Sequence, residues 1–407
     1  MRIEGFKIDG IANIEHANIK IRELCALIAP NGYGKSNLLK AIEFGVGFIK
    51  ADDTERRQML RGRWISINTK MLGRNFSFEI EGNIDIDDEE QQFVYSYQLS
   101  WAHDAQEGKV ITEVLKIKRP TDQRFRQLIN RTADECLIVP SAAGRCNKAY
   151  EVFANELALS SIARSTAMFL NGITRQIYDV QVPNLESLDN PESYFSVGDG
   201  RGIRVLGGIT LSEYLYRLKT EDESNYAILV DGLKQLIPGI SDFSPEVVKL
   251  PGGQQIYDVR IKEKYCVQPT SIAQLSSGSK RIVFLFTLCI AAKKQNIPMI
   301  MLEEPENSVH PRMMENLLLA MRNYASDTRI LITSHSPYLM RYLQPDQMYF
   351  GLPMNDGLAH FAQVDPSKLK FLYKYAGDME LTFGEFMFDF MLDVENDNEK
   401  LDKYFIQ

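Results

Sequence analysis

The sequence predicts an α/β fold in which short buried strands alternate with helices, with an antiparallel lobe attached. Two observations support this class. Three short apolar runs, LCALIAP, PMIMLEEP and ILITSHSP, each lead into glycine, acidic or hydroxyl residues, as strands ending at one edge of an open sheet do. Between about 74 and 118, apolar and polar residues alternate, which predicts an antiparallel sheet of about three strands.

Composition limits the classes of protein that fit. The 407 residues carry a net charge of −8, so a strongly basic body, typical of obligate nucleic-acid binders, is excluded, although a local basic face is compatible with it. The N-terminus lacks the apolar core of a signal peptide, and the longest apolar run, 282–292, is too short for a membrane span and predicts a buried helix. Scattered cysteines without a C-x-x-C pair indicate free thiols in a reducing, cytoplasmic setting: Cys25, Cys136, Cys146, Cys266 and Cys289.

The stretch LIAPNGYGKSN, residues 27–37, lies between a predicted strand and a predicted helix, the context of a phosphate-binding loop. The usual G-x-x-x-x-G-K-[ST] pattern starts with glycine, but this chain has Ala29 there. Backbone N–H groups and the helix dipole would bind phosphate oxygens, Lys35 would reach the β- and γ-phosphates, and Ser36 would contact Mg²⁺. The alternative is a plain glycine turn. The predicted nucleotide-binding residues here are Asn31, Gly32, Tyr33, Gly34, Lys35, Ser36 and Asn37.

Two carboxylates follow the apolar run of PMIMLEEPENSVHP, residues 298–311. Glu303 would supply a hard oxygen ligand to Mg²⁺, directly or through a water. Glu304 would polarise the water that attacks the γ-phosphate. The alternative is an acidic helix N-terminus, which the helix dipole favours.

Two further stretches place polar residues at the ends of buried elements. In ILITSHSPYL, residues 330–339, His335 would sense the γ-phosphate and hold the attacking water, whereas the alternative is a helix capped by serine. In QLSSGSKRIVFLF, residues 274–286, Ser276, Ser277 and Gly278 precede a long buried helix and would bind an anion. An ordinary serine cap is again the alternative.

The order of these four stretches resembles the ABC-type ATPase superfamily of P-loop NTPases. LSSGS is similar to its signature motif, MIMLEEP to its Walker B strand and ILITSHS to its histidine switch. The resemblance implies ATP and Mg²⁺ as cofactors, ATP hydrolysis with Lys35, Glu304 and His335 as catalytic residues, and an ABC-type head with an antiparallel β lobe and a helical lobe. In that family the signature of one subunit closes over the ATP of another, which implies a homodimer or higher homo-oligomer.

EEPENSVHP and TSHSP resemble the ATPase half of the OLD (overcoming-lysogenization-defect) and RecF-like group. OLD nucleases carry a C-terminal Toprim domain, but the acidic residues here lack its arrangement and predict a solvated tail: Asp389, Asp393, Glu395 and Asp397. By family analogy, the chain is expected to be an ATP-dependent switch that controls a separate toxin or nuclease in prokaryotic anti-phage defence. The alternatives are a RecF-like DNA-repair ATPase and an ATP-locked scaffold with little turnover that sequesters an effector.

The predicted organisation is a single head in several parts. A nucleotide-binding core combines 1–55 and 265–365, an antiparallel lobe covers 70–120, a helical lobe covers 140–265, and an acidic extension covers 366–407. Helices are expected at about 149–178 and 211–237, with a loop between them.

The glutamine loop of the family has three weak candidates, Gln91, Gln92 and Gln98, and Arg145 is a candidate phosphate contact. Basic side chains could bind a DNA backbone, form a solvated face or dock an acidic partner: Arg56, Arg57, Arg61, Arg63, Lys116, Lys118 and Arg119.

Overall fold

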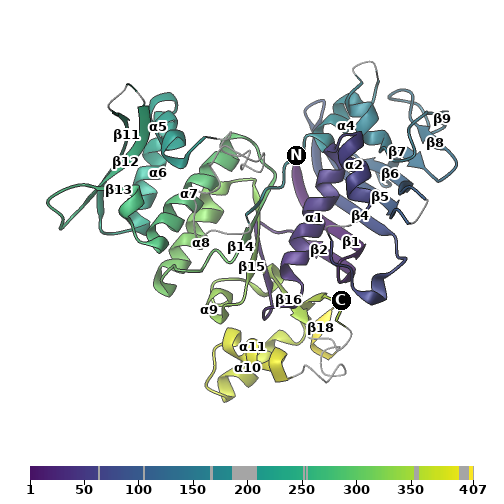
Figure 1. Ribbon diagram of the computed structural model, residues 1–407. Coiled ribbons are helices and arrows are strands. Elements are labelled where there is room, and N and C mark those ends of the chain that lie inside the picture. The colour runs from purple at the N-terminus through teal and green to yellow at the C-terminus, as the bar shows by residue number, and fades with distance from the viewer. Residues whose placement is uncertain are drawn as a thin grey trace.

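A mixed sheet of seven strands, in the order β10-β14-β15-β3-β16-β17-β18, forms the centre of the structure, a computed structural model (Figure 1). The structure describes residues 1–62, 65–103, 106–165, 168–185, 209–250, 253, 255–352, 357–393 and 403–406. The parallel strands are β10 (Asn184–Leu185), β14 (Met299–Glu303), β15 (Arg329–Ser334), β3 (Leu24–Ile28) and β16 (Met348–Leu352), and β17 (His360–Val364) and β18 (Phe405–Ile406) continue the sheet antiparallel.

The central strand β3 is buried on both faces, as expected for a parallel strand covered on two sides. Leu24, Ala26 and Ile28 belong to the hydrophobic cluster that contains helix α7 (Ser277–Lys294). Cys25 and Leu27 belong to the cluster that contains helix α1 (Lys35–Lys50). The two helices therefore cover opposite faces of the same sheet, and the predicted buried helix at 282–292 is confirmed as part of α7.

A second sheet is entirely antiparallel and has eight strands in the order β2-β1-β4-β5-β6-β7-β8-β9. The three antiparallel strands predicted between about 74 and 118 are confirmed as the segments 76–86, 89–100 and 109–118. The sheet extends beyond them and includes residues 2–20, which the sequence had assigned to the nucleotide core. Phe44 of α1 packs edge-on against Phe76 of β4 at 4.9 Å between ring centroids, which joins this sheet to α1. The strands are β1 (Arg2–Ile11), β2 (Ile14–Lys20), β4 (Phe76–Ile86), β5 (Glu89–Ser100), β6 (Lys109–Lys118), β7 (Arg126–Arg131), β8 (Cys136–Ile138) and β9 (Lys148–Ala149).

The predicted helical lobe of 140–265 is divided between the two hydrophobic clusters. The single helix expected at 149–178 is replaced by β9 and two short helices, α3 (Ala158–Ala163) and α4 (Asn171–Tyr178), which pack with the antiparallel sheet. The helix expected at 211–237 is confirmed as α5 (Leu211–Glu221) and α6 (Glu223–Leu236), which pack with α7. Most of the loop predicted between them lies outside the described residues. A three-stranded sheet follows, built from β11 (Ile240–Lys249), β12 (Gln255–Glu263) and β13 (Thr270–Ser271).

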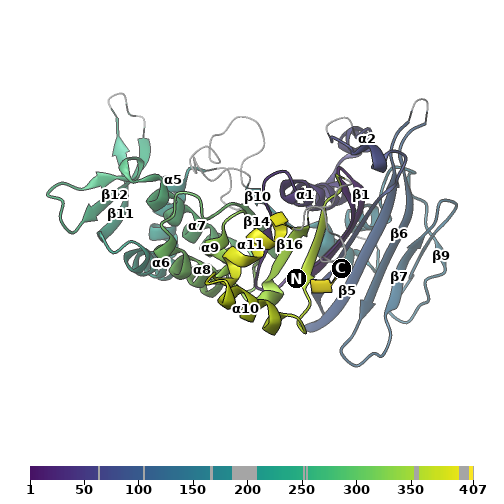
Figure 2. The same ribbon diagram turned by 90° about the horizontal axis from the view of Figure 1, so that it is seen from below.

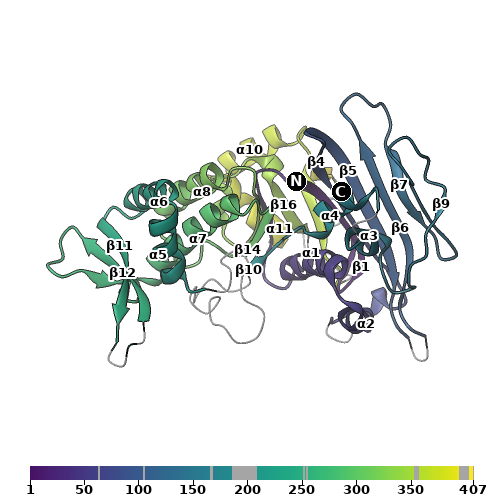
Figure 3. The same ribbon diagram turned by 90° about the horizontal axis from the view of Figure 1, so that it is seen from above.

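Figures 2 and 3 show the eight-stranded sheet and the β11–β13 sheet at opposite ends of the molecule, with the parallel sheet between them. In the C-terminal part of the chain, α11 (Phe383–Asp393) packs against α9 (Pro337–Met340), and α10 (Leu369–Asp378) packs against α11 (Figure 1). The predicted acidic extension is thus partly helical, with Asp389 in α11, while Glu395 and Asp397 lie outside the described residues. The remaining elements are α2 (Asp53–Leu60), η1 (Thr69–Met71), η4 (Ile272–Gln274), α8 (Pro311–Ala325), α9 (Pro337–Met340), η5 (Pro345–Gln347), α10 (Leu369–Asp378) and α11 (Phe383–Asp393).

Two glycines of α1 give a matched test of how α1 packs on the antiparallel sheet. A Cβ at Gly45 would lie 2.2 Å from Cδ2 of Phe78, whereas a Cβ at Gly47 meets nothing closer than 3.8 Å. We expect Gly45→Ala to destabilise the protein by about 1–2 kcal/mol through overpacking, and Gly47→Ala to stabilise it by about 0.5–1 kcal/mol through helix propensity. Denaturant unfolding of both variants measures this, and equal effects would show that α1 does not pack here as described.

Candidate nucleotide-binding site

The carboxyl ends of three adjacent parallel strands meet at one edge of the central sheet. Strand β15 lies between β14 and β3, with Glu303 paired in register to Thr333 and Ser334 to Ile28. The phosphate-loop segment, the two glutamates and the histidine follow directly after these strands. Segments far apart in sequence are thus brought to the location where open α/β sheets bind ligands.

The loop after β3 has the backbone that its glycines predict. Gly32 and Gly34 both have φ of 88°, the left-handed region in which glycine is favoured. Gly34 is the N-cap of α1 and makes no side-chain cap, and the first turn of α1 contains no acidic residue, so the positive end of the helix dipole faces the loop. Ala29 is fully buried, and a Cβ at Gly351 of β16 would lie 2.6 Å from the Ala29 methyl. The departure from the glycine pattern is accommodated by this neighbouring glycine.

Lys35 lies across the loop that precedes it. Its Nζ donates to the backbone carbonyl of Ala29 at 2.6 Å and to that of Pro30 at 3.1 Å. Burial lowers the pKa of Lys35 below its ordinary value, while the charges of Glu304, Glu306 and Glu303 oppose this shift. The negative charges of the three carboxylates thus favour the charged form of the ammonium, which phosphate binding requires.

Ser36 and Glu303 are brought together as predicted for a shared Mg²⁺ site. Ser36 Oγ donates to Glu303 Oε2 at 2.9 Å, which links the start of α1 to the end of β14. Mg²⁺ is commonly bound by one or two protein oxygen ligands together with substrate phosphates and water, and this pair fits that requirement. Within the part of the chain that the structure describes, no three His, Cys, Asp or Glu side chains are grouped to hold a metal ion by themselves.

Glu304 and His335 form a pair next to the loop. His335 Nδ1 lies 2.8 Å from Glu304 Oε1, and Asn307 Nδ2 donates to Glu304 Oε2 at 2.7 Å. Burial raises the pKa of Glu304, but the hydrogen bonds from Asn307 and His335 and the charges of His335 and Lys35 outweigh it and leave the pKa below its ordinary value. The carboxylate is thus held ionised, which suits a residue that accepts a hydrogen bond from water.

The backbone of Glu304 is held in an unusual conformation. Its φ is 48°, in the left-handed region that non-glycine residues adopt at a cost of about 1–3 kcal/mol. The N–H of Glu304 donates to the carbonyl of Thr333 at 3.0 Å, and Arg281 Nη1 of α7 donates to the carbonyl of Glu304 at 3.0 Å. Bonds from two elements therefore fix the direction of this side chain.

Sequence reasoning missed several residues of this site. Glu306 accepts a short hydrogen bond from Ser334 Oγ, and its charge adds a third carboxylate beside Lys35. The sequence did contain a signal for Glu306, because it is the third glutamate of EEPE. Asn13, in the turn between β1 and β2, accepts from Asn37 Nδ2 at 2.8 Å, and its position in a distant segment gave no sequence signal.

The predicted signature residues lie at the start of α7, on the other face of the sheet from α1. Ser276 is the N-cap and accepts from the N–H of Ser279 at 3.2 Å, so the predicted serine cap is present. Ser276 and Ser277 are exposed. A Cβ at Gly278 would lie 2.2 Å from the carbonyl oxygen of Ser308, so only glycine lets α7 begin this close to the loop after β14. The structure brings these residues together with one another but not with α1 of the same chain.

The weaker candidates are not gathered at this edge. Arg145 is exposed just before β9, at the far end of the eight-stranded sheet from β2, roughly 30 Å away at the usual strand spacing. The three glutamines lie on β5, where Gln91 is buried and donates to Glu89 at 3.4 Å. Neither result supports a glutamine loop or a phosphate contact at these positions.

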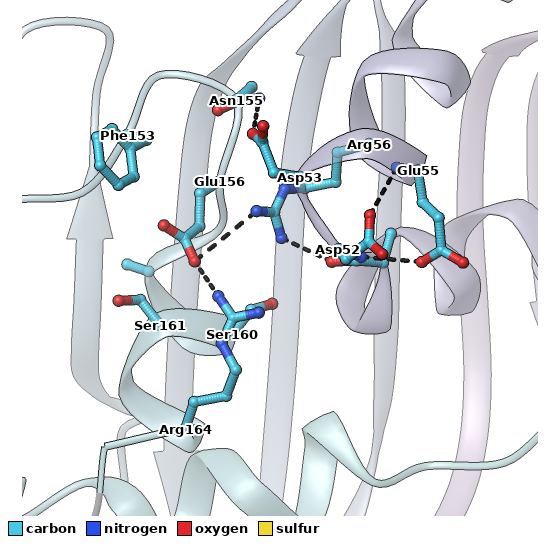
Figure 4. Close-up of polar contacts among 12 residues, drawn as sticks. Asp52, Asp53, Glu55, Arg56, Phe153, Asn155, Glu156, Ser160, Ser161 and Arg164 are labelled. Carbon is cyan, nitrogen blue, oxygen red and sulfur yellow. Dashed lines mark hydrogen bonds and ion pairs between the residues drawn. The ribbon is translucent and has the colours of Figure 1, made fainter.

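The residues of the predicted basic cluster differ in burial, and Figure 4 shows the contacts of Arg56, which is buried. Arg56 is only 4% exposed, donates to the carbonyl of Ala51 at 2.7 Å and lies 3.9 Å from Glu156. It is therefore part of neither a solvated face nor an exposed basic surface, two of the alternatives for this cluster. Glu156 also pairs with Arg164. Arg57 is exposed and bonds to Asp53 and Glu107. Arg61, Lys116 and Arg119 are exposed, Lys118 lies over the ring of Phe125, and Arg63 is outside the described residues.

Comparison with known proteins supports the fold. Residues 261–341 match the family model described as "AAA domain, putative AbiEii toxin, Type IV TA system". The structure of the SmcHead bound to the C-winged helix domain of ScpA is similar, with a TM-score of 0.52 at 13% identity over 90% of this chain and 99% of that one. The fold is accordingly α/β of the ABC-type ATPase head class.

Two further structures are similar with lower TM-scores. These are the SMC head domain from Thermotoga maritima, at 0.44 with 13% identity over 90% of this chain and 100% of that one, and the Smc head domain with an extended coiled coil bound to the C-terminal domain of ScpA from Pyrococcus furiosus, at 0.46 with 10% identity over 92% and 99%. Curated protein sequences gave no match. Among the described helices, none has both the length and the apolar character needed to cross a bilayer.

The pKa of Glu306 predicts a measurable effect on stability. Burial raises this pKa above its ordinary value of 4.5, so the stability of the folded state is reduced as pH rises through the folded pKa and the carboxyl must ionise. We expect the stability advantage of Glu306→Gln over the parent protein to increase as pH rises above about 4.5, because glutamine does not ionise. Unfolding midpoints across this range test it, with exposed Glu315→Gln on α8 as control, and a pH-independent difference would contradict it.

Proposed function

We propose that this protein is an ATP-binding and ATP-hydrolysing switch. The observation that carries the proposal is the meeting of Lys35, the Ser36–Glu303 pair and the Glu304–His335 pair at the ends of three neighbouring strands. Phosphoryl transfer to water requires a cation, a pair of hard oxygen ligands and an ionised carboxylate near one helix N-terminus. The fold of an ABC-type ATPase head is consistent with this chemistry.

In this proposal, each side chain acts where the structure places it. The loop of residues 31–37 binds the triphosphate through its backbone N–H groups, and Lys35 contacts the terminal phosphates. Ser36 and Glu303 would hold Mg²⁺, which would supply positive charge to the phosphate oxygens. Glu304 accepts a hydrogen bond from the attacking water. His335, bonded to the same carboxylate, orients that carboxylate and contacts the γ-phosphate.

The start of α7 completes the site from a second copy. Ser276 and Ser277 are exposed at a helix N-terminus, and α7 packs on the face of the sheet opposite α1, so the two serines are available to a neighbour. ATP would therefore close a homodimer, or a pair within a larger homo-oligomer, and hydrolysis would open it. A conformational cycle of this kind lets the nucleotide control a partner.

The biological role is proposed from the comparisons. The description of the family model that matches residues 261–341 names a putative toxin and a Type IV TA system. This description supports a role in controlling a separate toxin or nuclease effector in cytoplasmic anti-phage defence. A RecF-like role in DNA repair has lost part of its support, because Arg56 of the expected basic face is buried.

Two substitutions test the site directly. Lys35→Ala removes charge-assisted bonds of about 1.5–3 kcal/mol each, so ATP affinity is expected to fall about 100-fold or more. Glu304→Gln keeps the shape of the side chain but removes the base, so ATP should still bind while kcat falls about 10²- to 10⁴-fold, and the closed dimer should accumulate. Isothermal titration, phosphate release and size-exclusion chromatography with light scattering measure these effects.

Matched controls are available on the exposed faces of the same region. Lys40→Ala on α1 and Glu315→Gln on α8 change the same residue types away from the strand ends and should retain the parent's ATP turnover. If Lys35→Ala and Glu304→Gln both hydrolyse ATP like the parent protein, the assignment of the site is wrong.

Mixing two inactive variants tests the contribution of the second copy. Lys35→Ala disables the loop, and Ser277→Arg would block the exposed start of α7. A heterodimer of the two chains retains one complete site, formed by the loop of the Ser277→Arg chain and the α7 start of the Lys35→Ala chain. For a symmetric dimer that exchanges subunits randomly, we expect the mixture to recover about a quarter of the parent's turnover. No recovery after verified exchange would argue against a site shared between chains.

A further inference from the structure

Glu306 lies beside the candidate site but has no direct role in the proposed hydrolysis of ATP. It follows β14 by three residues, and its Oε1 accepts the hydrogen of Ser334 Oγ at the end of β15. Ser334 is completely buried, so its hydroxyl needs a partner inside the protein. Ser334 Oγ in turn accepts from the backbone N–H of Ser336 at 3.0 Å. One carboxylate therefore holds both residues that flank His335.

The same two segments are also joined through the functional pair. Glu304 and Glu306 both belong to the loop after β14, and each bonds to the segment 334–336: Glu304 through His335 Nδ1 at 2.8 Å and Glu306 through Ser334. Both bonds are partly buried, but the His335 side chain is 41% exposed whereas Ser334 is fully buried at the strand end. The Ser334 end is thus the less accessible of the two to competing water.

The free-energy cost of burying the Glu306 carboxylate indicates that this residue does more than fill space. Its Oε2 is buried without a hydrogen-bond partner in the part of the chain described, and Glu304 carries a like charge close by. A buried, unsatisfied carboxylate oxygen destabilises a folded protein by about 1–3 kcal/mol or more, so a purely structural residue at this position would be better replaced by a neutral acceptor. Such groups are expected where function requires them.

We propose that Glu306 is a positioning residue for His335. Through Ser334 it fixes the backbone on both sides of the histidine, and so fixes the direction in which the ring meets Glu304 and the γ-phosphate. This inference deepens and rests on the proposed ATPase function. Glu306 itself contacts neither the nucleotide nor the attacking water.

A set of four variants separates positioning from a simple loss of stability. Glu306→Leu and Ser334→Ala each remove the anchor and should lower kcat about 10- to 100-fold, the range for residues that orient catalytic groups, with KM for ATP within about twofold of the parent's. Glu306→Gln keeps an acceptor for Ser334 Oγ and should recover most of the kcat lost in Glu306→Leu. Because both act through one bond, the double variant Glu306→Leu/Ser334→Ala should be no slower than the slower single variant.

The matched control is Glu315→Leu on exposed α8, which should retain the parent's kcat. Thermal unfolding shows whether each variant is folded, and if Glu306→Leu is not, Ser334→Ala carries the same test. The proposal is overturned if the anchor-removing variant keeps the parent's kcat, if Glu306→Gln is as slow as Glu306→Leu, or if the double variant shows multiplied effects.

A second readout does not depend on turnover. The chain has five histidines, so the ring signal of His335 can be assigned in a long-range ¹H–¹⁵N spectrum by its loss in His335→Asn. Glu306→Leu and Ser334→Ala should shift or broaden that signal, and Glu306→Gln should leave it close to the parent's position. An unchanged His335 signal in Glu306→Leu overturns the positioning role, whereas a parent protein without ATP turnover overturns only the proposed function.

Discussion

The parallel register of β14, β15 and β3 is the constraint on which the rest of the site depends. Glu303 is paired with Thr333, and Ser334 with Ile28, so three strand ends lie side by side. Their apolar residues are buried from both faces, because α7 and α1 cover opposite sides of the sheet. A register slip of one residue would reverse the facing of every side chain in a strand and bury polar groups in one of the two clusters. The hydrophobic packing therefore holds the polar ends in place.

The polar ends are joined to one another by a small number of bonds that cross between strands. Ser36 reaches Glu303, His335 reaches Glu304, and Ser334 reaches Glu306. The charges of the three carboxylates, Glu303, Glu304 and Glu306, act on the buried Lys35 ammonium and favour its charged form. These bonds connect segments from both ends of the chain, so a displacement of one segment is transmitted to the others. This connectivity is the physical basis for a nucleotide-controlled switch of the proposed kind.

Sequence patterns predicted the parts of the fold whose signal is local. Short apolar runs followed by glycine or by charged residues marked β3, β14 and β15, and the apolar run at 282–292 marked α7. The helices around 211–237 were likewise evident from their periodicity. Other features depend on distant partners. Alternation predicted the strands within 76–118, but not that they would join residues 2–20 and 126–149 in one eight-stranded sheet, and the burial of Arg56 depends on the distant Glu156. The role of Glu306 needed the position of Ser334, which only the sheet register supplies.

The contact between Ala29 and Gly351 changes what the phosphate-loop pattern means. The glycine at the first position of the loop pattern is usually understood as a limit on side-chain size at that position alone. Here the fully buried methyl of Ala29 occupies the volume that a Cβ at Gly351 would need, since the two would be 2.6 Å apart. The steric limit applies to the combined side-chain volume at positions 29 and 351, so a small residue at either position satisfies it. Homologous chains are therefore expected to exchange the small residue between these two positions, and a motif search that insists on the first glycine would reject such chains despite an intact loop.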